Sequence, residues 1–293
     1  MAAQPTTKPA AAAGTVRIGD LTVNRMGFGA MRLTGPGVIG PPDDAEGALG
    51  ILRRAVELGV NFIDTADSYG PEVNERQIAE ALHPYPEGLV IATKGGLLHE
   101  RRGEWRQDGR PETLRAACES SLERLRLERI DLYQLHSVDP TVPIEESVGA
   151  LAELQREGKI RHIGLSNVDT RQLAQARRVA PVVSVQNRYS VADRPWEGMV
   201  DACEREGIAF LPWFPLGFGE LARSRGHLAE LGANRGATAA QIAIAWLLRR
   251  SPVMLPIPGS STLAHLEENV AAAGIELSDT EFAELSGSAA AAL

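Results

Sequence analysis

The chain has 293 residues, of which 44% are hydrophobic and 23% are charged. This composition is typical of a globular protein and excludes a disordered or fibrous chain. The net charge of -8 argues against a nucleic acid or an anionic membrane surface as a partner. Two cysteines are present, Cys118 and Cys203, and their spacing indicates neither a disulfide framework nor a zinc site. No metal is therefore expected.

Residues 1–14 are rich in Ala, Pro and Thr and lack the apolar centre of a signal peptide. We expect a disordered N-terminal tail, followed by one domain over residues 15–293. No apolar run is long enough to predict a membrane-spanning helix. We expect a cytoplasmic protein, and nothing in the sequence indicates a protein partner.

Residues 16–18 and 21–23 flank Gly19-Asp20 and predict a short hairpin. Eight apolar runs of strand length follow, and at least one helical segment separates each from the next. These runs are residues 25–29, 60–64, 89–93, 130–135, 160–165, 182–186, 208–212 and 253–257. A last helix is expected from Ser278 onward.

Strands that alternate with helices predict a parallel sheet with right-handed crossovers. Eight such units favour an α/β fold, the (β/α)8 TIM barrel, here with a short N-terminal β-hairpin and a C-terminal helix. The alternative is a Rossmann domain with a second domain, which requires the pattern GxGxxG after the first strand. Residues 27–32 read Gly-Phe-Gly-Ala-Met-Arg and lack the third glycine. We therefore predict a single barrel.

Active sites of such barrels form where the strands end. Asp64 and Tyr69 follow the second run, Lys94 the third and His136 the fourth. A tyrosine has a reference pKa of about 10, which the ammonium of Lys94 would lower, while Asp64 would keep Lys94 charged. His136 could orient a carbonyl oxygen. Each residue alone also fits a structural role, but their joint placement at three strand ends favours a proton-transfer site.

The segment 62–70, Phe-Ile-Asp-Thr-Ala-Asp-Ser-Tyr-Gly, together with Lys94 and His136 resembles the Asp, Tyr, Lys, His tetrad of the aldo-keto reductases. The resemblance extends over residues 16–272. It implies hydride transfer from a nicotinamide cofactor to an aldehyde or ketone, with Tyr69 protonating the developing alkoxide. Loop 29–42 is similar to a bacterial subgroup that includes pyridoxal reductases, which implies pyridoxal or another small carbonyl compound as the substrate.

The resemblance also implies a cofactor site. Ser166, Asn167 and Gln186 would bind the nicotinamide carboxamide, and Trp213 would stack on its ring. A helix N-terminus preceded by small residues suits a phosphate. The other residues implied for the cofactor are Pro215, Leu216, Gly217, Gly259, Ser260, Ser261, His265, Glu268 and Asn269.

Two of these positions depart from the family pattern, because Gly259 and His265 stand where many members have Lys and Arg. We expect NADPH as the cofactor, with NADH as the alternative. Two other functions remain open. Lys94 could form a Schiff base in an aldolase, or the barrel could bind the cofactor as a non-enzymatic sensor or subunit.

Overall fold

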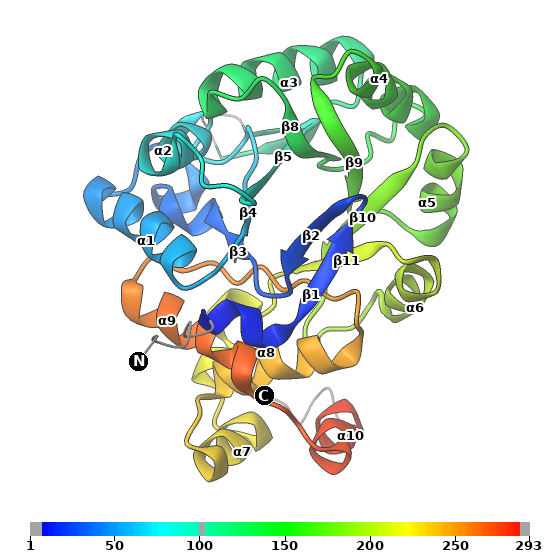
Figure 1. Cartoon of the computed structure of the whole chain (residues 1–293). Helices are drawn as coiled ribbons and strands as arrows, with labels where there is room; N and C mark the ends of the chain where they lie inside the picture. Colours follow the sequence, from blue (N-terminus) through cyan, green and yellow to red (C-terminus); the bar gives the residue numbers. More distant parts are fainter. Residues whose placement is uncertain (1–7, 100–102, 288–293) are drawn as a thin grey trace, which may run out of the picture.

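The computed structural model describes residues 8–99 and 103–287. Within these residues, seven parallel strands form a sheet that curls into a barrel, with helices packed around it (Figure 1). The sheet order is β11-β10-β9-β8-β5-β4-β3. The strands are β3 (Phe28–Gly29), β4 (Phe62–Asp64), β5 (Val90–Gly95), β8 (Ile130–Leu135), β9 (Ile160–Ser166), β10 (Val182–Arg188) and β11 (Ala209–Trp213). The predicted α/β barrel class is confirmed.

The eighth predicted strand, residues 253–257, closes the barrel without being a regular strand. Phe210 N donates to Val253 O at 2.9 Å on one side, and Gly27 N donates to Pro256 O at 2.9 Å on the other. Pro256 has no N–H to add to a ladder, and a proline also lies at each flank of the segment. The prediction of a full strand is therefore wrong here, although the segment occupies the strand's place.

The helices form the outer layer of the barrel (Figure 1). They are α1 (Ala45–Glu57), α2 (Val73–Leu82), α3 (Pro111–Leu125), α4 (Ile144–Arg156), α5 (Thr170–Arg177), α6 (Glu197–Glu206), α7 (His227–Arg235), α8 (Ala239–Arg250), α9 (Leu263–Ala271) and α10 (Asp279–Gly287). Helix α10 confirms the last predicted helix.

The apolar face that the sequence predicts for α1 is buried. Ile51, Leu52 and Ala55 are at most 3% exposed and lie in one core cluster with Phe28 and Ile63 of the neighbouring strands. Spacings of three and four residues place these side chains on one side of the helix, which packs on the sheet. Their burial fixes the strand ends that carry the site.

The predicted N-terminal hairpin is confirmed as β1 (Thr15–Ile18) and β2 (Leu21–Asn24). Figure 1 shows it across the middle of the barrel. Its side chains Val16, Ile18 and Val23 are buried in one cluster with residues of the barrel interior, such as Phe62 and Leu132. At its turn, Asp20 pairs with Arg161, at the start of β9. The hairpin thus covers the N-terminal end of the barrel, and the C-terminal end remains for the site.

The predicted tail is partly wrong. Residues Pro9–Ala13 form a 3-10 helix, η1, in which Ala10 is completely buried. Ala10 N donates to Leu58 O at 3.0 Å, so this segment is attached to the end of α1. Small alanine side chains allow that close packing. The expected disorder therefore fails for residues 8–14, and residues 1–7 lie outside the described residues.

A second hairpin, which the sequence did not predict, follows β5. It consists of β6 (Leu97–His99) and β7 (Trp105–Gln107), paired antiparallel. His99 and Trp105 face one another with ring centroids 3.9 Å apart and planes 8° apart. His99 Nδ1 also lies 3.1 Å from Val38 O. The hairpin is therefore held to the loop that follows β3.

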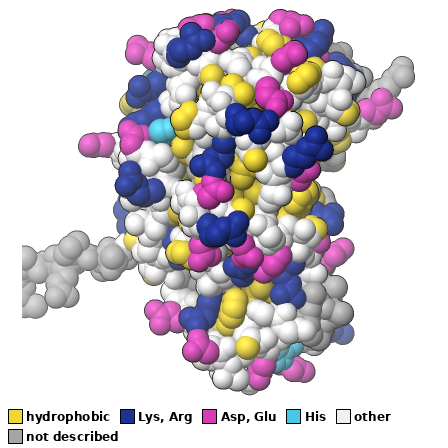
Figure 2. All heavy atoms as spheres, turned by 90° about the vertical axis from the view of Figure 1, so that its right-hand side faces the viewer, with side chains coloured by type: hydrophobic (Ala, Val, Ile, Leu, Met, Phe, Trp, Pro, Cys, Tyr) yellow, Lys and Arg dark blue, Asp and Glu magenta, His cyan; other side chains and the backbone are white. Residues whose placement is uncertain are grey.

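The face of the molecule in Figure 2 carries basic and acidic side chains interspersed with one another. Ion pairs join several of the outer helices, for example Arg178 with Glu145 and Arg250 with Glu197. This face therefore presents no continuous basic surface. Over the parts of the chain described above, no helix combines the length and apolar character needed to cross a membrane.

Candidate active site

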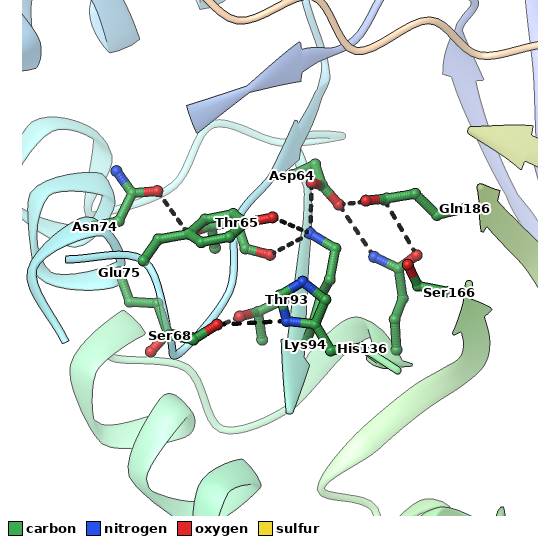
Figure 3. A network of polar contacts seen from close by, with 12 residues as sticks. Asp64, Thr65, Ser68, Asn74, Glu75, Thr93, Lys94, His136, Ser166 and Gln186 are labelled. Atoms are coloured by element: carbon green, nitrogen blue, oxygen red, sulfur yellow. Dashed lines mark hydrogen bonds and ion pairs between the residues drawn. The ribbon is translucent and has the colours of Figure 1, made fainter. Parts of the chain in front are cut away.

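The four residues of the predicted proton-transfer site come together at the C-terminal ends of the strands. Figure 3 shows three of them, Asp64, Lys94 and His136. Lys94 Nζ lies 2.7 Å from Asp64 Oδ2 and 3.3 Å from Tyr69 Oη. The rings of Tyr69 and His136 meet edge to face, with centroids 5.7 Å apart. All four side chains are buried, and Lys94 is 0% exposed. Strand ends that are far apart in sequence thus bring together the phenol of Tyr69, the ion pair of Lys94 with Asp64 and the imidazole of His136.

The position of Lys94 follows from the pleat of the sheet. Neighbouring residues on β5 point to opposite faces, so Thr93 faces the outer helices while Lys94 faces the barrel interior. There the ammonium donates to Asp64 Oδ2, and it also donates to the main-chain oxygen of Thr65 at 2.9 Å. With Tyr69 Oη, three oxygens thus surround the ammonium. These contacts compensate for the loss of water around a buried charge.

The second oxygen of Asp64 is also occupied. Gln186 Nε2 donates to Asp64 Oδ1 at 2.8 Å, and Gln134 Nε2 donates to the same atom at 3.1 Å. The sequence implied Gln186 as a ligand of the cofactor carboxamide, and here its amide nitrogen is bound to the carboxylate of Asp64. One oxygen of the carboxylate therefore accepts from two amides, while the other accepts from Lys94.

The surroundings shift the pKa values of Lys94 and Tyr69, and the shift of Tyr69 differs from the one expected. Burial opposes the charge of Lys94, but the neighbouring Asp64 and Tyr69 outweigh it, and the pKa of Lys94 lies above its ordinary value. Burial raises the pKa of Tyr69, and Lys94 lowers it by less. The expected net lowering of the tyrosine pKa is therefore wrong, because the loss of water outweighs the nearby ammonium.

A protonated Lys94 bears on the aldolase alternative. A Schiff-base lysine needs a neutral amine, which desolvation or another cation can provide. Lys94 instead has an anionic partner at 2.7 Å and a raised pKa. These contacts favour a lysine that stays charged over one that attacks a carbonyl carbon.

His136 is neutral near pH 7. Burial, together with the charge of Lys94, holds the pKa of His136 well below its usual 6.5. Its Nδ1 lies 3.4 Å from Ser68 Oγ (Figure 3). A neutral imidazole has one N–H to donate, so His136 can donate to a substrate oxygen without carrying charge.

The residues implied for the nicotinamide lie together at the neighbouring strand ends. Asn167 follows β9 with a positive φ of 57°, and its Nδ2 donates to His136 O at 3.0 Å and to Ser166 Oγ at 3.1 Å. Trp213 Nε1 donates to Asn167 Oδ1 at 3.0 Å. Asn167 therefore links β8, β9 and β11 and fixes the indole beside Ser166.

The loop after β11 includes the three implied residues Pro215, Leu216 and Gly217. Pro215 is buried, and Leu216 and Gly217 are partly exposed. Gly217 has a positive φ of 54°, and its N–H donates to Phe214 O at 3.0 Å. A tight turn therefore places this loop directly after the strand that carries Trp213.

The loop before α9 lies against the end of β3. A Cβ atom at Gly259 would lie 2.6 Å from Gly29 O, so the two backbones approach too closely for any side chain there. A lysine at position 259 would therefore require one of the two backbone segments to shift. Ser260 is buried, and its hydroxyl donates to Thr262 O and accepts from Thr262 N, which shapes the turn.

Ser261 and the implied α9 residues have different surroundings. Ser261 lines a cavity of about 500 Å³ between α1 and the loop that follows β3. His265 is exposed and Asn269 is buried. The carboxylate of Glu268 accepts from Thr238 Oγ1 at 2.6 Å. The structure therefore gathers Gly259, Ser260 and Ser261 in one loop, whereas Glu268 is bound to α8.

Several polar residues around the tetrad were not predicted. Gln134 holds Asp64, and Ser68 approaches His136. Helix α2 adds Asn74 and Glu75, both 0% exposed. Gln134 is a polar residue in a mostly apolar strand, and Asn74 and Glu75 lie on the buried side of α2, which is the signal that could have found these three. Ser68 lies in the turn that follows β4, where a serine gives no such signal.

The sequence profile described as the Aldo/keto reductase family matches residues 25–290. Pyridoxine 4-dehydrogenase of Escherichia coli is 45% identical over 279 residues, which cover 93% of this chain and 97% of that protein. An uncharacterized oxidoreductase of Schizosaccharomyces pombe is 50% identical over 276 residues, covering 94% of this chain and 90% of that protein.

Solved structures have the same fold. An aldo/keto reductase from Klebsiella pneumoniae in complex with NADP and acetate superposes with a TM-score of 0.81 at 28% identity, covering 92% of this chain and 93% of that chain. A glycerol dehydrogenase from Gluconobacter oxydans superposes with a TM-score of 0.86 at 27% identity, covering 94% of both chains.

Proposed function

Because the chain belongs to the aldo/keto reductase family, we propose that it reduces an aldehyde or ketone with NADPH, and that Tyr69 donates the proton. The observation that carries this proposal is the buried contact of Lys94 Nζ with both Asp64 Oδ2 and Tyr69 Oη. An ammonium held next to a phenol stabilises the phenolate that remains after proton transfer.

In this proposal NADPH supplies the hydride that reaches the carbonyl carbon. Tyr69 donates its phenolic proton to the carbonyl oxygen as negative charge develops there. Lys94 stabilises the resulting phenolate, and Asp64 keeps Lys94 charged and in place. His136, which is neutral, donates a hydrogen bond that orients the same oxygen.

The residues of the chain fit a nicotinamide dinucleotide. Trp213, fixed by its hydrogen bond to Asn167, offers a partly exposed aromatic ring beside Ser166, while Gln186 supports the site through Asp64. Pro215, Leu216 and Gly217, in the loop after β11, would contact the pyrophosphate of the cofactor.

The adenosine end would lie against a different loop. Gly259, Ser260 and Ser261 precede α9, whose N-terminus favours a negative group. His265, Glu268 and Asn269 follow on that helix. The NADP complex of the Klebsiella pneumoniae relative supports the choice of NADPH.

Pyridoxal or another small carbonyl compound is the substrate that we propose. The E. coli relative named pyridoxine 4-dehydrogenase supports a pyridine aldehyde as the substrate and the corresponding alcohol as the product. The hairpin β6–β7 stacks His99 on Trp105, and Trp105 is 42% exposed. An exposed aromatic ring of this kind can stack on a planar substrate.

The test is the consumption of NADPH and, separately, NADH by the purified protein with pyridoxal and a panel of small aldehydes. The proposal predicts oxidation of NADPH with pyridoxal and equimolar formation of the alcohol. Tight binding of NADPH without turnover on any carbonyl compound would favour a cofactor sensor. Consumption of NADH in preference to NADPH would correct the cofactor.

A further inference from the structure

Helix α2 carries two consecutive buried polar residues, Asn74 and Glu75, which lie to one side of Asp64 and Lys94 (Figure 3). Consecutive residues on a helix point about 100° apart, so one helix edge here reaches two different strand ends. Neither side chain touches the atoms of the proposed proton transfer. Buried polar groups of this kind are costly unless each finds a partner.

Asn74 binds the hydroxyl of Thr65, the residue after Asp64, and the main-chain oxygens of two further residues. Its Oδ1 accepts from Thr65 Oγ1 at 2.7 Å, and its Nδ2 donates to Ala30 O at 3.0 Å. Its own N–H donates to the main-chain oxygen of Tyr69 at 3.3 Å. Thr65 O in turn accepts from the ammonium of the site lysine, so Asn74 fixes both an acceptor of that lysine and the chain that carries the tyrosine.

Glu75 holds the strand that carries the lysine. Its Oε1 accepts from Thr93 Oγ1 at 2.6 Å, and Thr93 directly precedes Lys94. Its Oε2 pairs with Arg124 Nε at 2.6 Å, and both side chains are buried. Arg124 also donates to Ser121 Oγ at 3.2 Å. Glu75, paired with Arg124 of α3, thus binds β5 on its outer face through Thr93, the residue next to Lys94.

We infer that α2 is a positioning element for the proposed reaction: Asn74 and Glu75 set the place of Asp64 and Lys94 by holding Thr65 and Thr93. The kinetic part of this inference rests on the proposed function, and the geometric part does not. Active-site groups must be held to within about 0.5 Å of their productive positions. The hydroxyl of Thr93 is the link through which Glu75 acts on Lys94.

The test replaces that link. Thr93→Val keeps the shape of the side chain and removes the hydroxyl, whereas Thr93→Ser keeps the hydroxyl and removes a methyl group. Glu75→Gln provides a second variant, which retains an oxygen for Thr93 and loses the charge opposite Arg124. Tyr85→Phe is the control, because the Tyr85 hydroxyl donates to Leu125 O at 2.7 Å, away from the site.

Crystal structures of the wild type and of Thr93→Val give the distance from Lys94 Nζ to Tyr69 Oη. We expect this distance to lengthen by about 0.5 Å or more in Thr93→Val. We also expect kcat for carbonyl reduction to fall about 10-fold, with an unchanged dissociation constant for NADPH. The alkaline limb of the pH profile of kcat should move to higher pH, because a displaced Lys94 lowers the tyrosine pKa less.

Thr93→Ser should keep the wild-type distance from Lys94 Nζ to Tyr69 Oη, most of the wild-type kcat and the wild-type alkaline limb of the pH profile. Tyr85→Phe should lose thermal stability alone. An unchanged distance in folded Thr93→Val overturns the inference, as does a lengthened distance with unchanged kcat. If the wild type reduces no carbonyl compound, the proposed function fails, and the distance alone then decides whether α2 positions Lys94.

Discussion

Lys94 and Asp64 form an ion pair of 2.7 Å between two neighbouring strands of the barrel, and both side chains are at most 4% exposed. Breaking a buried pair by removing one partner leaves the other charge without compensation. The carboxylate also accepts from Gln134 and Gln186. The pair is therefore expected to contribute to stability as well as to activity, and the two contributions can be separated.

Asp64→Asn should destabilise the fold by about 3–5 kcal/mol, because Lys94 would remain buried and charged without its anion. Carbonyl reduction should fall at the same time. Urea unfolding and steady-state kinetics measure the two effects. Adding Lys94→Met to Asp64→Asn should recover much of the stability and none of the activity. If Asp64→Asn alone has the same urea unfolding midpoint as the wild type, this account of the pair is contradicted.

His136 should not titrate over the physiological range. Its pKa is lowered by burial and by the charge of Lys94, so the imidazole stays neutral as the pH falls from 8 through its ordinary value of about 6.5. NMR of the His136 ring protons, assigned with His136→Gln, measures the titration. The urea-unfolded protein is the control and should titrate near the ordinary value. A folded-state midpoint at that same value would refute the prediction.

Asp67 gives the stability of the protein a pH dependence. Burial and the neighbouring Glu75 raise the pKa of Asp67 to about 7, although Arg124 opposes them. The folded state then holds a proton that the unfolded state releases near pH 3.8. Its contribution to stability is thus present at low pH and is lost as the pH rises from about 4 to about 7.

Asp67→Asn removes this ionisation. The variant should gain thermal stability relative to the wild type at pH 8 and much less at pH 4.5, as melting curves at the two pH values will show. Asp43→Asn serves as the control, since Asp43 is exposed. An equal gain at both pH values would mean that ionisation of Asp67 is not the cause.

Gly259→Ala should destabilise the protein by about 1–3 kcal/mol, because the new Cβ would press on Gly29 O. Weaker binding of NADPH should accompany this, since the loop carries Ser260 and Ser261. Gly149→Ala is the matched change, at a position in α4 where a Cβ meets nothing within 4 Å. It should stabilise the protein by about 0.5–1 kcal/mol. Denaturant unfolding and NADPH titration measure both variants, and equal stabilities would contradict the close approach at Gly259.

The sequence predicted the barrel because hydrophobic periodicity directly reports which face of an element is buried. The face of α1 around Ile51 and Leu52 is buried as expected. The N-terminal segment was misjudged because an Ala- and Pro-rich composition is the same for a disordered chain and for one that packs Ala10 against Leu58. The eighth strand was misjudged because its prolines satisfy the apolar pattern but not the hydrogen-bond ladder.

The candidate site was predictable in its residues and less so in its contacts. Positions at strand ends indicated Asp64, Lys94 and His136. That Gln186 binds Asp64, and that Glu75 binds Thr93, depends on side-chain geometry that spacing does not contain. The direction of the Tyr69 pKa shift likewise required the extent of burial, because desolvation and the ammonium act in opposite directions.

The most direct test of the proposed function is kcat for NADPH-dependent reduction of pyridoxal by Tyr69→Phe, beside Tyr85→Phe as a hydroxyl-removal control. We predict that Tyr69→Phe loses at least about 100-fold in kcat, the contribution expected of a general acid, and binds NADPH as the wild type does, while Tyr85→Phe retains its rate. A Tyr69→Phe protein that reduces pyridoxal as fast as the wild type would contradict the assignment of Tyr69 as the proton donor.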